Sequence, residues 1–297
     1  MDLHPSHPGL PERPVLRPGL AVTRHDDHHL QVGIDPPQRV VVPDLPEVRR
    51  LLDALVHGLE PPRADEHTWP VLRRLCEADL LVDAGALTAS TASAPVVAAK
   101  AAWAQFGSGA GARLAARASA RVAIMADDEV RAGASRLLRD SGVGVAEEGE
   151  TADVWLISHP GETPRASADH LVRDGVPHLL VAGALGSVHL GPFVLPGATA
   201  CLRCLDAHRA DVDPRRPLVV EQVTSRPPPL RHDPALHALA LAWAVRDLLR
   251  FVEGDQPSTW STSFEIGPVA APVARTWTRH PHCGCSWDES LVGQVAR

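Results

Sequence analysis

The chain has 297 residues, of which 44% are hydrophobic and 22% charged, and its formal net charge is −7. This length allows two ordinary domains, each with its own core. The acidic balance argues against a general nucleic-acid binder, which is normally basic. No apolar run approaches the roughly 20 residues of a membrane span, and no signal peptide is evident. We therefore expect a cytoplasmic protein with no membrane or nucleic-acid partner.

The first ninety residues predict a small domain that mixes strands and helices. Residues 1–18 are rich in proline and histidine, and we expect them to be frayed. Alternating apolar residues on either side of a polar, acidic turn predict a β-hairpin over residues 20–34. Three consecutive valines at 40–42 predict a third short strand. Two helices are predicted next, from Pro46 to a stop at Gly58 and from Glu66 to Ala78.

Strands followed by helices in this order are typical of a winged-helix domain. One use of such a domain is DNA binding, but its last helix mixes Arg73 and Arg74 with acidic residues, which suits phosphate poorly. The other use is strand addition, in which the edge strand at 40–42 pairs with an extended peptide beside that helix. Cys76, on the same helix, is interpreted as a buried core thiol.

The middle of the chain predicts a linker and then an α/β domain. Residues 91–118 are dominated by Ala, Ser, Gly and Thr, which predicts a tether or a loosely docked helix between domains. Beyond them, apolar strands alternate with helices, which predicts a parallel, doubly wound sheet. The predicted strands are 121–125, 154–157 and 178–181, and the helices are 128–141 and 167–173. An irregular crossover is expected over 213–232, then a helix over 234–253 and strands at 261–266 and 273–277.

The turn after the first strand of this domain disfavours nucleotide binding. In nucleotide-binding versions of the architecture, a glycine-rich turn lets the backbone approach the phosphates at a helix N-terminus. Here the turn is Ala126-Asp-Asp-Glu129, which places three carboxylates where a phosphate would lie. We therefore expect no ATP site, and no nucleophile motif with a partnered base is evident.

Four of the five cysteines form two close pairs, Cys201-Leu-Arg-Cys204 and Cys283-Gly-Cys285. Two thiolate pairs brought together make a tetrahedral sulfur set, which structural zinc prefers. Two disulfides in a secreted protein are the alternative, which a cytoplasmic setting disfavours. A closed sulfur set leaves no open position for substrate, so the zinc would be structural. Structural roles around it are also expected for His208, His280 and His282.

Residues 191–209 and 280–285 resemble the ThiF-like partner proteins of azoline-forming (TOMM) peptide biosynthesis, which are similar in build to ubiquitin-activating enzymes. Residues 14–19 and 30–37 resemble the winged-helix RiPP recognition element found at the start of many of these proteins. The resemblance implies a winged-helix recognition element at 1–90, a linker at 91–118 and a ThiF-like, Rossmann-like domain at 119–297. It also implies a zinc ion on Cys201, Cys204, Cys283 and Cys285.

By this resemblance the chain is a non-catalytic protein of natural-product biosynthesis. It would bind the leader of a ribosomal precursor peptide and present the core to a separate YcaO-type cyclodehydratase, which forms thiazolines or oxazolines. Activating-enzyme-like domains often pair, so the analogy includes a homodimer. The residues expected in the leader groove are Val40, Val41, Val42, Trp69, Leu72, Arg73 and Cys76.

Two other functions stay open at this point. The first is an adenylating activator of the ubiquitin-activating type, which would need an unconventional ATP site. The second is a zinc-stabilised winged-helix regulator that binds DNA, which the acidic balance disfavours. No catalytic residue is predicted.

Overall fold

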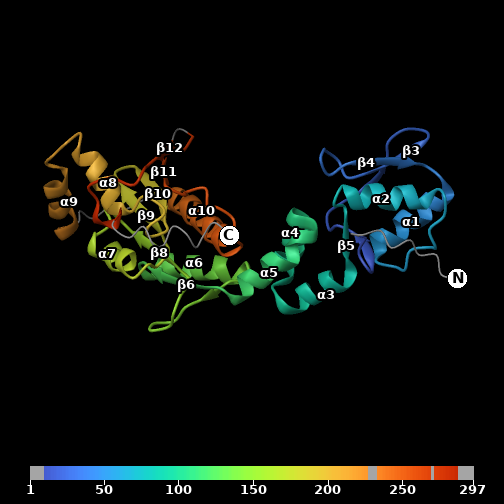
Figure 1. Cartoon of the computed structure of the whole chain (residues 1–297), viewed down its shortest axis with the longest axis horizontal. Helices are drawn as coiled ribbons and strands as arrows, with labels where there is room; N and C mark the ends of the chain where they lie inside the picture. The colour runs from blue at the N-terminus through green and yellow to red at the C-terminus, as the bar shows by residue number, and fades with distance from the viewer. Residues whose placement is uncertain (1–9, 227–232, 269–270, 287–297) are drawn as a thin grey trace. The chain divides into compact units, whose positions relative to one another are not determined.

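The computed structural model describes residues 10–226, 233–268 and 271–286 (Figure 1). The chain divides into two compact units, Met1–Ala116 and Arg117–Arg297, which we describe separately. Among the described residues, no helix is both long and apolar enough to cross a membrane.

Unit 1 contains a three-stranded antiparallel sheet in the order β2-β3-β4, as the hairpin and the third strand predicted. Its strands are β2 (Val22–Arg24), β3 (His29–Val32) and β4 (Val40–Pro43). A second, two-stranded sheet pairs β1 (Pro14–Leu16) with β5 (Leu81–Asp83). The expectation that residues 1–18 are frayed is therefore wrong for β1, whose partner lies far along the chain; residues 1–9 lie outside the described residues.

Two helices cover the three-stranded sheet, α1 (Pro46–His57) and α2 (Thr68–Glu77). α1 ends as predicted at Gly58, which has a left-handed φ of 67° that favours glycine. Apolar residues of both helices pack with the inward residues of β3 and β4 in one core. Cys76 lies at the margin of this core and is half-buried rather than buried as expected.

The stretch predicted as a linker is largely helical. It is occupied by the end of α3 (Ala84–Ser93), by α4 (Val96–Phe106), by the short helix η1 (Gly107–Gly109) and by α5 (Ala110–Ser119). Trp103 explains the difference, because it is buried with small residues of α4 and with Val15 and Val82 in a core of its own. Alanine suits helices and allows them to pack closely around the one large ring.

Unit 2 is built on a seven-stranded mixed sheet in the order β12-β11-β10-β9-β8-β6-β7. The parallel half consists of β6 (Arg121–Met125), β7 (Gly144–Val145), β8 (Val154–His159) and β9 (His178–Ala184). The antiparallel half consists of β10 (Ser187–Val194), β11 (Thr262–Ile266) and β12 (Val273–Thr276). The expected parallel sheet is thus correct for one half. The turn Leu185–Gly186 is too short for a crossover and makes β9 and β10 antiparallel.

Helices cover both faces of this sheet. Leu156 and Leu179 face a core that includes α6 (Asp128–Asp140) and α10 (Pro234–Val252). Their neighbours Ile157 and Leu180 face the opposite core, with α7 (Ala166–Arg173) and the start of α8 (Leu202–Ala210). The crossover expected to be irregular over 213–232 contains the helix α9 (Arg216–Ser225), and residues 227–232 lie outside the described residues.

Asp247 of α10 anchors the turn that leads into β11. It is 1% exposed, and its two carboxylate oxygens accept hydrogen bonds from the backbone N–H and hydroxyl groups of Ser258 and Thr259 at 2.6–3.0 Å. A buried carboxylate is tolerated here because several donors satisfy it.

We expect Asp247→Asn to lower the free energy of unfolding by about 2–3 kcal/mol, because the amide nitrogen would face buried donors. Denaturant unfolding of the whole chain measures the change. Glu148→Gln is the matched control, since Glu148 is exposed in a loop of the same unit. Equal stability of the Asp247 variant and the control would contradict the anchoring role.

Candidate metal centre and peptide-binding edge

The fold brings the two cysteine pairs together. Cys201 directly precedes α8 and Cys204 lies in its first turn, while Cys283 and Cys285 follow β12. Neighbouring sulfur atoms are 3.7 Å apart for Cys201–Cys204 and for Cys201–Cys283, and 3.4 Å apart for Cys204–Cys285. All four sulfurs lie within 4.8 Å of one another, and three of the residues are buried. The group can therefore hold a metal ion.

These sulfur distances fit a tetrahedral ion bound through thiolates. Zinc–sulfur bonds of about 2.3 Å place the corners of a tetrahedron about 3.8 Å apart, whereas a disulfide would bring two sulfurs to about 2 Å. All four cysteines are free. The Cys201 thiol donates a hydrogen bond to the Cys204 sulfur. This bond raises the pKa of Cys201, which keeps its proton, and lowers the pKa of Cys204, which accepts the bond.

Histidines tie α8 to the segment that carries the second cysteine pair. His208 Nε2 lies 2.9 Å from the Thr278 carbonyl oxygen, and His280 Nε2 lies 3.1 Å from Asp211 Oδ2. His280 is 5% exposed, and its Nδ1 lies 3.2 Å from the backbone nitrogen of His282. His208, Asp211 and His280 are close enough to form a second metal-binding group. Their hydrogen bonds hold both sides of the cysteine cluster in place.

One edge of β4 has no partner strand in the described part of the chain. Among the described residues the strand pairs only with β3. Asp44 N donates to the His28 carbonyl at 2.8 Å, so by the antiparallel alternation Val40 and Val42 also point their backbone groups toward β3. The backbone groups of Val41 then point toward the free edge. The side chains of Val40 and Val42 are buried, and that of Val41 is half-buried.

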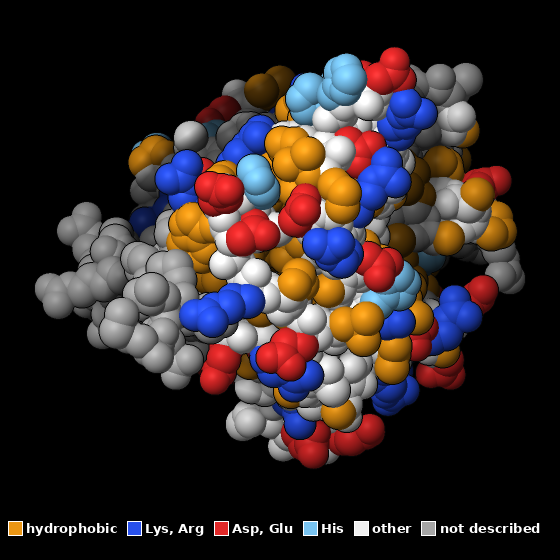
Figure 2. Space-filling model, turned by 90° about the vertical axis from the view of Figure 1, so that its right-hand side faces the viewer, with side chains coloured by type: hydrophobic (Ala, Val, Ile, Leu, Met, Phe, Trp, Pro, Cys, Tyr) orange, Lys and Arg blue, Asp and Glu red, His pale blue; other side chains and the backbone are white. Residues whose placement is uncertain are grey.

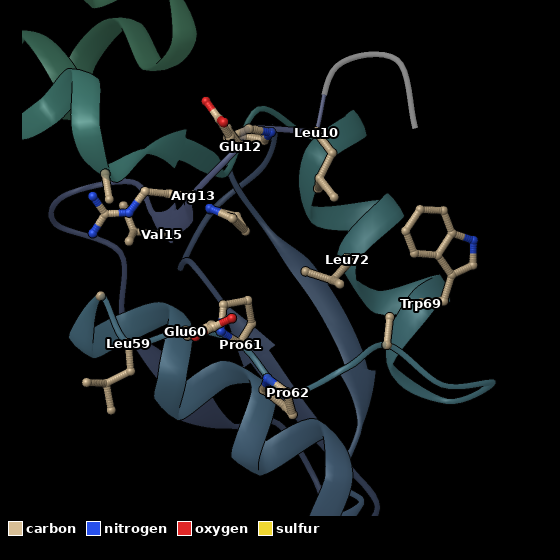
Figure 3. Close-up of a pocket in the computed structure, with 15 residues that line it drawn as sticks. Leu10, Glu12, Arg13, Val15, Leu59, Glu60, Pro61, Pro62, Trp69 and Leu72 are labelled. Carbon is tan, nitrogen blue, oxygen red and sulfur yellow. The ribbon is translucent and has the colours of Figure 1, made fainter. Parts of the chain in front are cut away.

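α2 presents the other predicted groove residues. Trp69 is half-buried, Leu72 is 5% exposed, and both line a cavity of about 640 Å³. Figure 3 shows Leu72 projecting from α2 into this cavity, toward Pro61 and Pro62. Burial raises the pKa of the half-buried Cys76, and Arg73 is exposed beside Glu77 on the same helix.

The cavity was not predicted, because two of its walls come from parts of the chain that carry no periodic pattern. One wall is the segment 10–15, which was expected to be frayed, and another is the proline-containing segment 58–64. β4 does not contribute to the walls of this cavity. The sequence feature that could have indicated this cavity is the presence of the apolar residues Leu10 and Leu59 in otherwise irregular segments.

The turn after β6 satisfies the N-terminus of α6 with the chain's own carboxylate. Asp127 caps the helix, and its Oδ1 accepts a hydrogen bond from Val130 N at 2.9 Å. A phosphate at this position would compete with that carboxylate for the same helix N-terminus and would be repelled by its charge.

Known structures share the fold of this chain at low sequence identity. No family model and no curated protein matches the sequence. Among solved structures, the heterocyclase TruD superposes with a TM-score of 0.69 at 16% identity, covering 92% of this chain and 42% of that chain. A heterocyclase in complex with substrate and cofactor superposes with a TM-score of 0.66 at 18% identity, covering 92% and 39%. The chain thus spans less than half the length of these heterocyclases.

Structures of a second protein, MccB, match this chain over almost their whole length. The microcin C7 biosynthetic enzyme MccB in complex with N-formylated MccA superposes with a TM-score of 0.61 at 15% identity, covering 92% of this chain and 99% of that chain. E. coli MccB with ATP gives 0.62 at 14% identity and the same coverage. This chain is therefore similar in fold to a heterocyclase and to a microcin biosynthetic enzyme.

Proposed function

We propose that unit 1 binds the leader of a ribosomal precursor peptide as an added strand on β4. In this proposal, unit 2 is a non-catalytic scaffold that presents the core of the precursor to a separate YcaO-type cyclodehydratase for azoline formation. The observation that carries the proposal is the free edge of β4 beside α2, at the end of a sheet of only three strands. Such an edge is a ready template for pairing with an extended peptide.

The backbone chemistry of this edge limits where the leader pairs. The outward groups of β4 are the N–H and carbonyl of Val41 and the carbonyl of Pro43, since proline has no N–H. An incoming strand would exchange a pair of hydrogen bonds with Val41 and accept none from Pro43. Val41 is therefore the residue that sets the register of the leader.

Side chains of α2 would add sequence preference to this backbone pairing. We assign apolar leader side chains to Trp69 and Leu72, whose cavity has the volume of a small-molecule pocket. Arg73 and Cys76, on the same helix, complete the proposed groove. In this assignment the strand edge supplies affinity and the cavity selects the residue that anchors it.

The comparisons support the biosynthetic setting. The solved heterocyclase chains extend well beyond the portion this chain matches, and one of them is a complex with substrate and cofactor. MccB, matched end to end, has been solved in complex with the peptide MccA.

DNA binding is the weaker use of unit 1. Figure 2 shows acidic and basic side chains interspersed over a face of this unit, without a continuous basic stripe on that face. Nucleic-acid sites concentrate Lys and Arg on one face.

Replacing Val41 by proline tests the strand pairing. Val41→Pro removes the outward N–H of β4 and leaves the bonds to β3 in place, so we expect leader affinity to fall about tenfold or more. Fluorescence polarisation with the labelled leader of the precursor encoded beside the gene measures it, using the whole chain. Val41→Thr keeps the N–H and should bind like wild type. Unchanged affinity in a folded Val41→Pro protein would exclude this edge.

We also propose that the four cysteines hold a structural zinc ion. Four thiolates at tetrahedral spacing are the donor set that zinc prefers, and they would leave no open coordination position. The ion would fasten α8 to the end of the antiparallel half of the sheet.

Metal analysis tests this assignment. We expect about one zinc ion bound by the cysteine cluster per chain, lost in Cys201→Ser together with stability of unit 2, because metal affinity and folding are linked. Cys76→Ser is the matched control, since Cys76 lies in unit 1 outside the cluster. Full zinc content in Cys201→Ser would contradict the assignment.

An adenylating activator is the second candidate, favoured by the end-to-end match to MccB with ATP. The Asp127 cap at the start of α6 argues against it. Calorimetric titration with Mg-ATP separates the two functions: we expect no saturable heat. A stoichiometric binding isotherm would overturn the scaffold role, and Asp127→Gly, which removes the competing carboxylate, shows whether the cap is the cause.

A further inference from the structure

A charged cluster in unit 2 lies beyond the carboxyl end of β8. The loop after β8 carries Glu162 and Arg165, α8 carries Asp206 and Arg209, and Arg216 begins α9, which packs against α8. Ligands of open α/β sheets bind outside the carboxyl ends of the strands, so this is a favourable position for a site. None of these residues belongs to the cysteine cluster or to the peptide-binding edge.

Both acids of the cluster are largely engaged by one arginine. The guanidinium of Arg165 donates to the two oxygens of Asp206, at 2.7 Å from Nε and 2.5 Å from Nη2. Its Nη1 also lies 2.8 Å from Glu162 Oε1. Arg165 is buried and the side chain of Asp206 is only 13% exposed, so this bidentate pair is a fixed part of the fold.

The two remaining arginines lack a matching carboxylate. Arg216 reaches Glu162 only at 3.7 Å, and its buried Nε has no hydrogen-bond partner in the described part of the chain. Arg209 is half-buried, and its guanidinium lies 5.3 Å from the centre of the Trp277 ring; it forms no ion pair with a described residue. Burial, followed by the positive charge of Arg216, lowers the pKa of Arg209. The positive charges of Arg209 and Arg216 are thus partly desolvated, and no described carboxylate meets either of them at hydrogen-bonding distance.

The charges in the cluster do not balance. Three guanidinium groups, on Arg165, Arg209 and Arg216, stand against the two carboxylates of Glu162 and Asp206. Glu265 of β11 is a third carboxylate nearby, since it acts on His189 together with Glu162, Arg209 and Arg216. It is exposed and forms no ion pair with a described residue, so water screens its charge. Half-buried charge without a partner is costly, and a bound anion relieves the cost.

We propose that Arg209 and Arg216 bind an oxyanion, either a carboxylate or a phosphate. The planar guanidinium groups suit both, because each can donate two parallel hydrogen bonds to two oxygens. A carboxylate would come from a peptide, and a phosphate from a phosphorylated small molecule. The proposal concerns unit 2 and stands independently of peptide binding by unit 1.

Calorimetry on the whole chain at low ionic strength tests this site. The probes are sodium phosphate, an N-acetylated alanine peptide with a free C-terminal carboxylate, and the same peptide as its C-terminal amide. We expect saturable one-to-one binding of phosphate or of the free-carboxylate peptide, and none of the amide. Binding of phosphate alone assigns a phosphate ligand, and binding of the peptide alone assigns a peptide carboxylate.

Two variants locate the binding. Arg209→Gln should weaken it about tenfold or more, the loss of a charge-assisted hydrogen bond. Arg203→Gln is the matched control on the same helix, because Arg203 is exposed and already paired with Asp169 at 2.7 Å. If Arg209→Gln does not fold by circular dichroism, Arg216→Gln must show the same weakening. Absence of saturable binding, or equal affinity in the folded arginine variant and wild type, would overturn the proposal.

Discussion

The meeting of four sulfur atoms is the constraint on which much of unit 2 depends. Cys201 and Cys204 enter the cluster at the start of α8, and Cys283 and Cys285 enter it after β12, with α9, α10 and two strands between the pairs. Buried thiols at 3.4–3.7 Å favour a shared cation over four separate protons. The hydrogen bonds of His208 and His280 hold the same two segments together, so the cluster and its surroundings close the antiparallel half of the sheet.

The proposed binding sites of the two units differ in the groups that lack partners, which are backbone groups in unit 1 and arginine side chains in unit 2. In unit 1 the outward N–H and carbonyl groups of Val41 have no partner strand among the described residues, and we propose that the leader peptide pairs with them. In unit 2 the helix N-terminus after β6 is satisfied internally by Asp127, whereas the guanidinium groups of Arg209 and Arg216 are not balanced. In the proposed function a separate cyclodehydratase carries out the chemistry, so this chain would need no nucleophile of its own.

Local patterns predicted the regular elements well. The valine strand at 40–42, the helix ended by Gly58 and the alternation of strands and helices beyond residue 118 are all present, because each depends on periodicity or on capping. The cysteine cluster was predicted because two close pairs are rarely accidental. Three points stay predictions: that the metal held by the cysteines is zinc, that unit 1 is a winged-helix domain, and that the leader binds in the predicted groove.

The failures came from contacts between distant segments. β1 forms only because β5 is available to pair with it. The alanine-rich stretch allowed either a tether or a docked helix, and its packing around Trp103 decides for helices. The cavity beside Leu72 and the charge imbalance at Arg209 likewise depend on which side chains meet in space. Charge clusters of this kind are visible in sequence only as scattered arginines.

Backbone hydrogen exchange tests the central claim most directly, because it observes the amide that should pair with the leader. The alternation of hydrogen bonds along β4 makes Val41 N–H open to solvent in the free protein, while the amides of Val40 and Val42 point toward β3. On saturation with the leader peptide, the account predicts strong new protection of the Val41 amide and little change at Val40 and Val42. Binding of the leader with no change in the exchange of Val41 would contradict strand addition on β4.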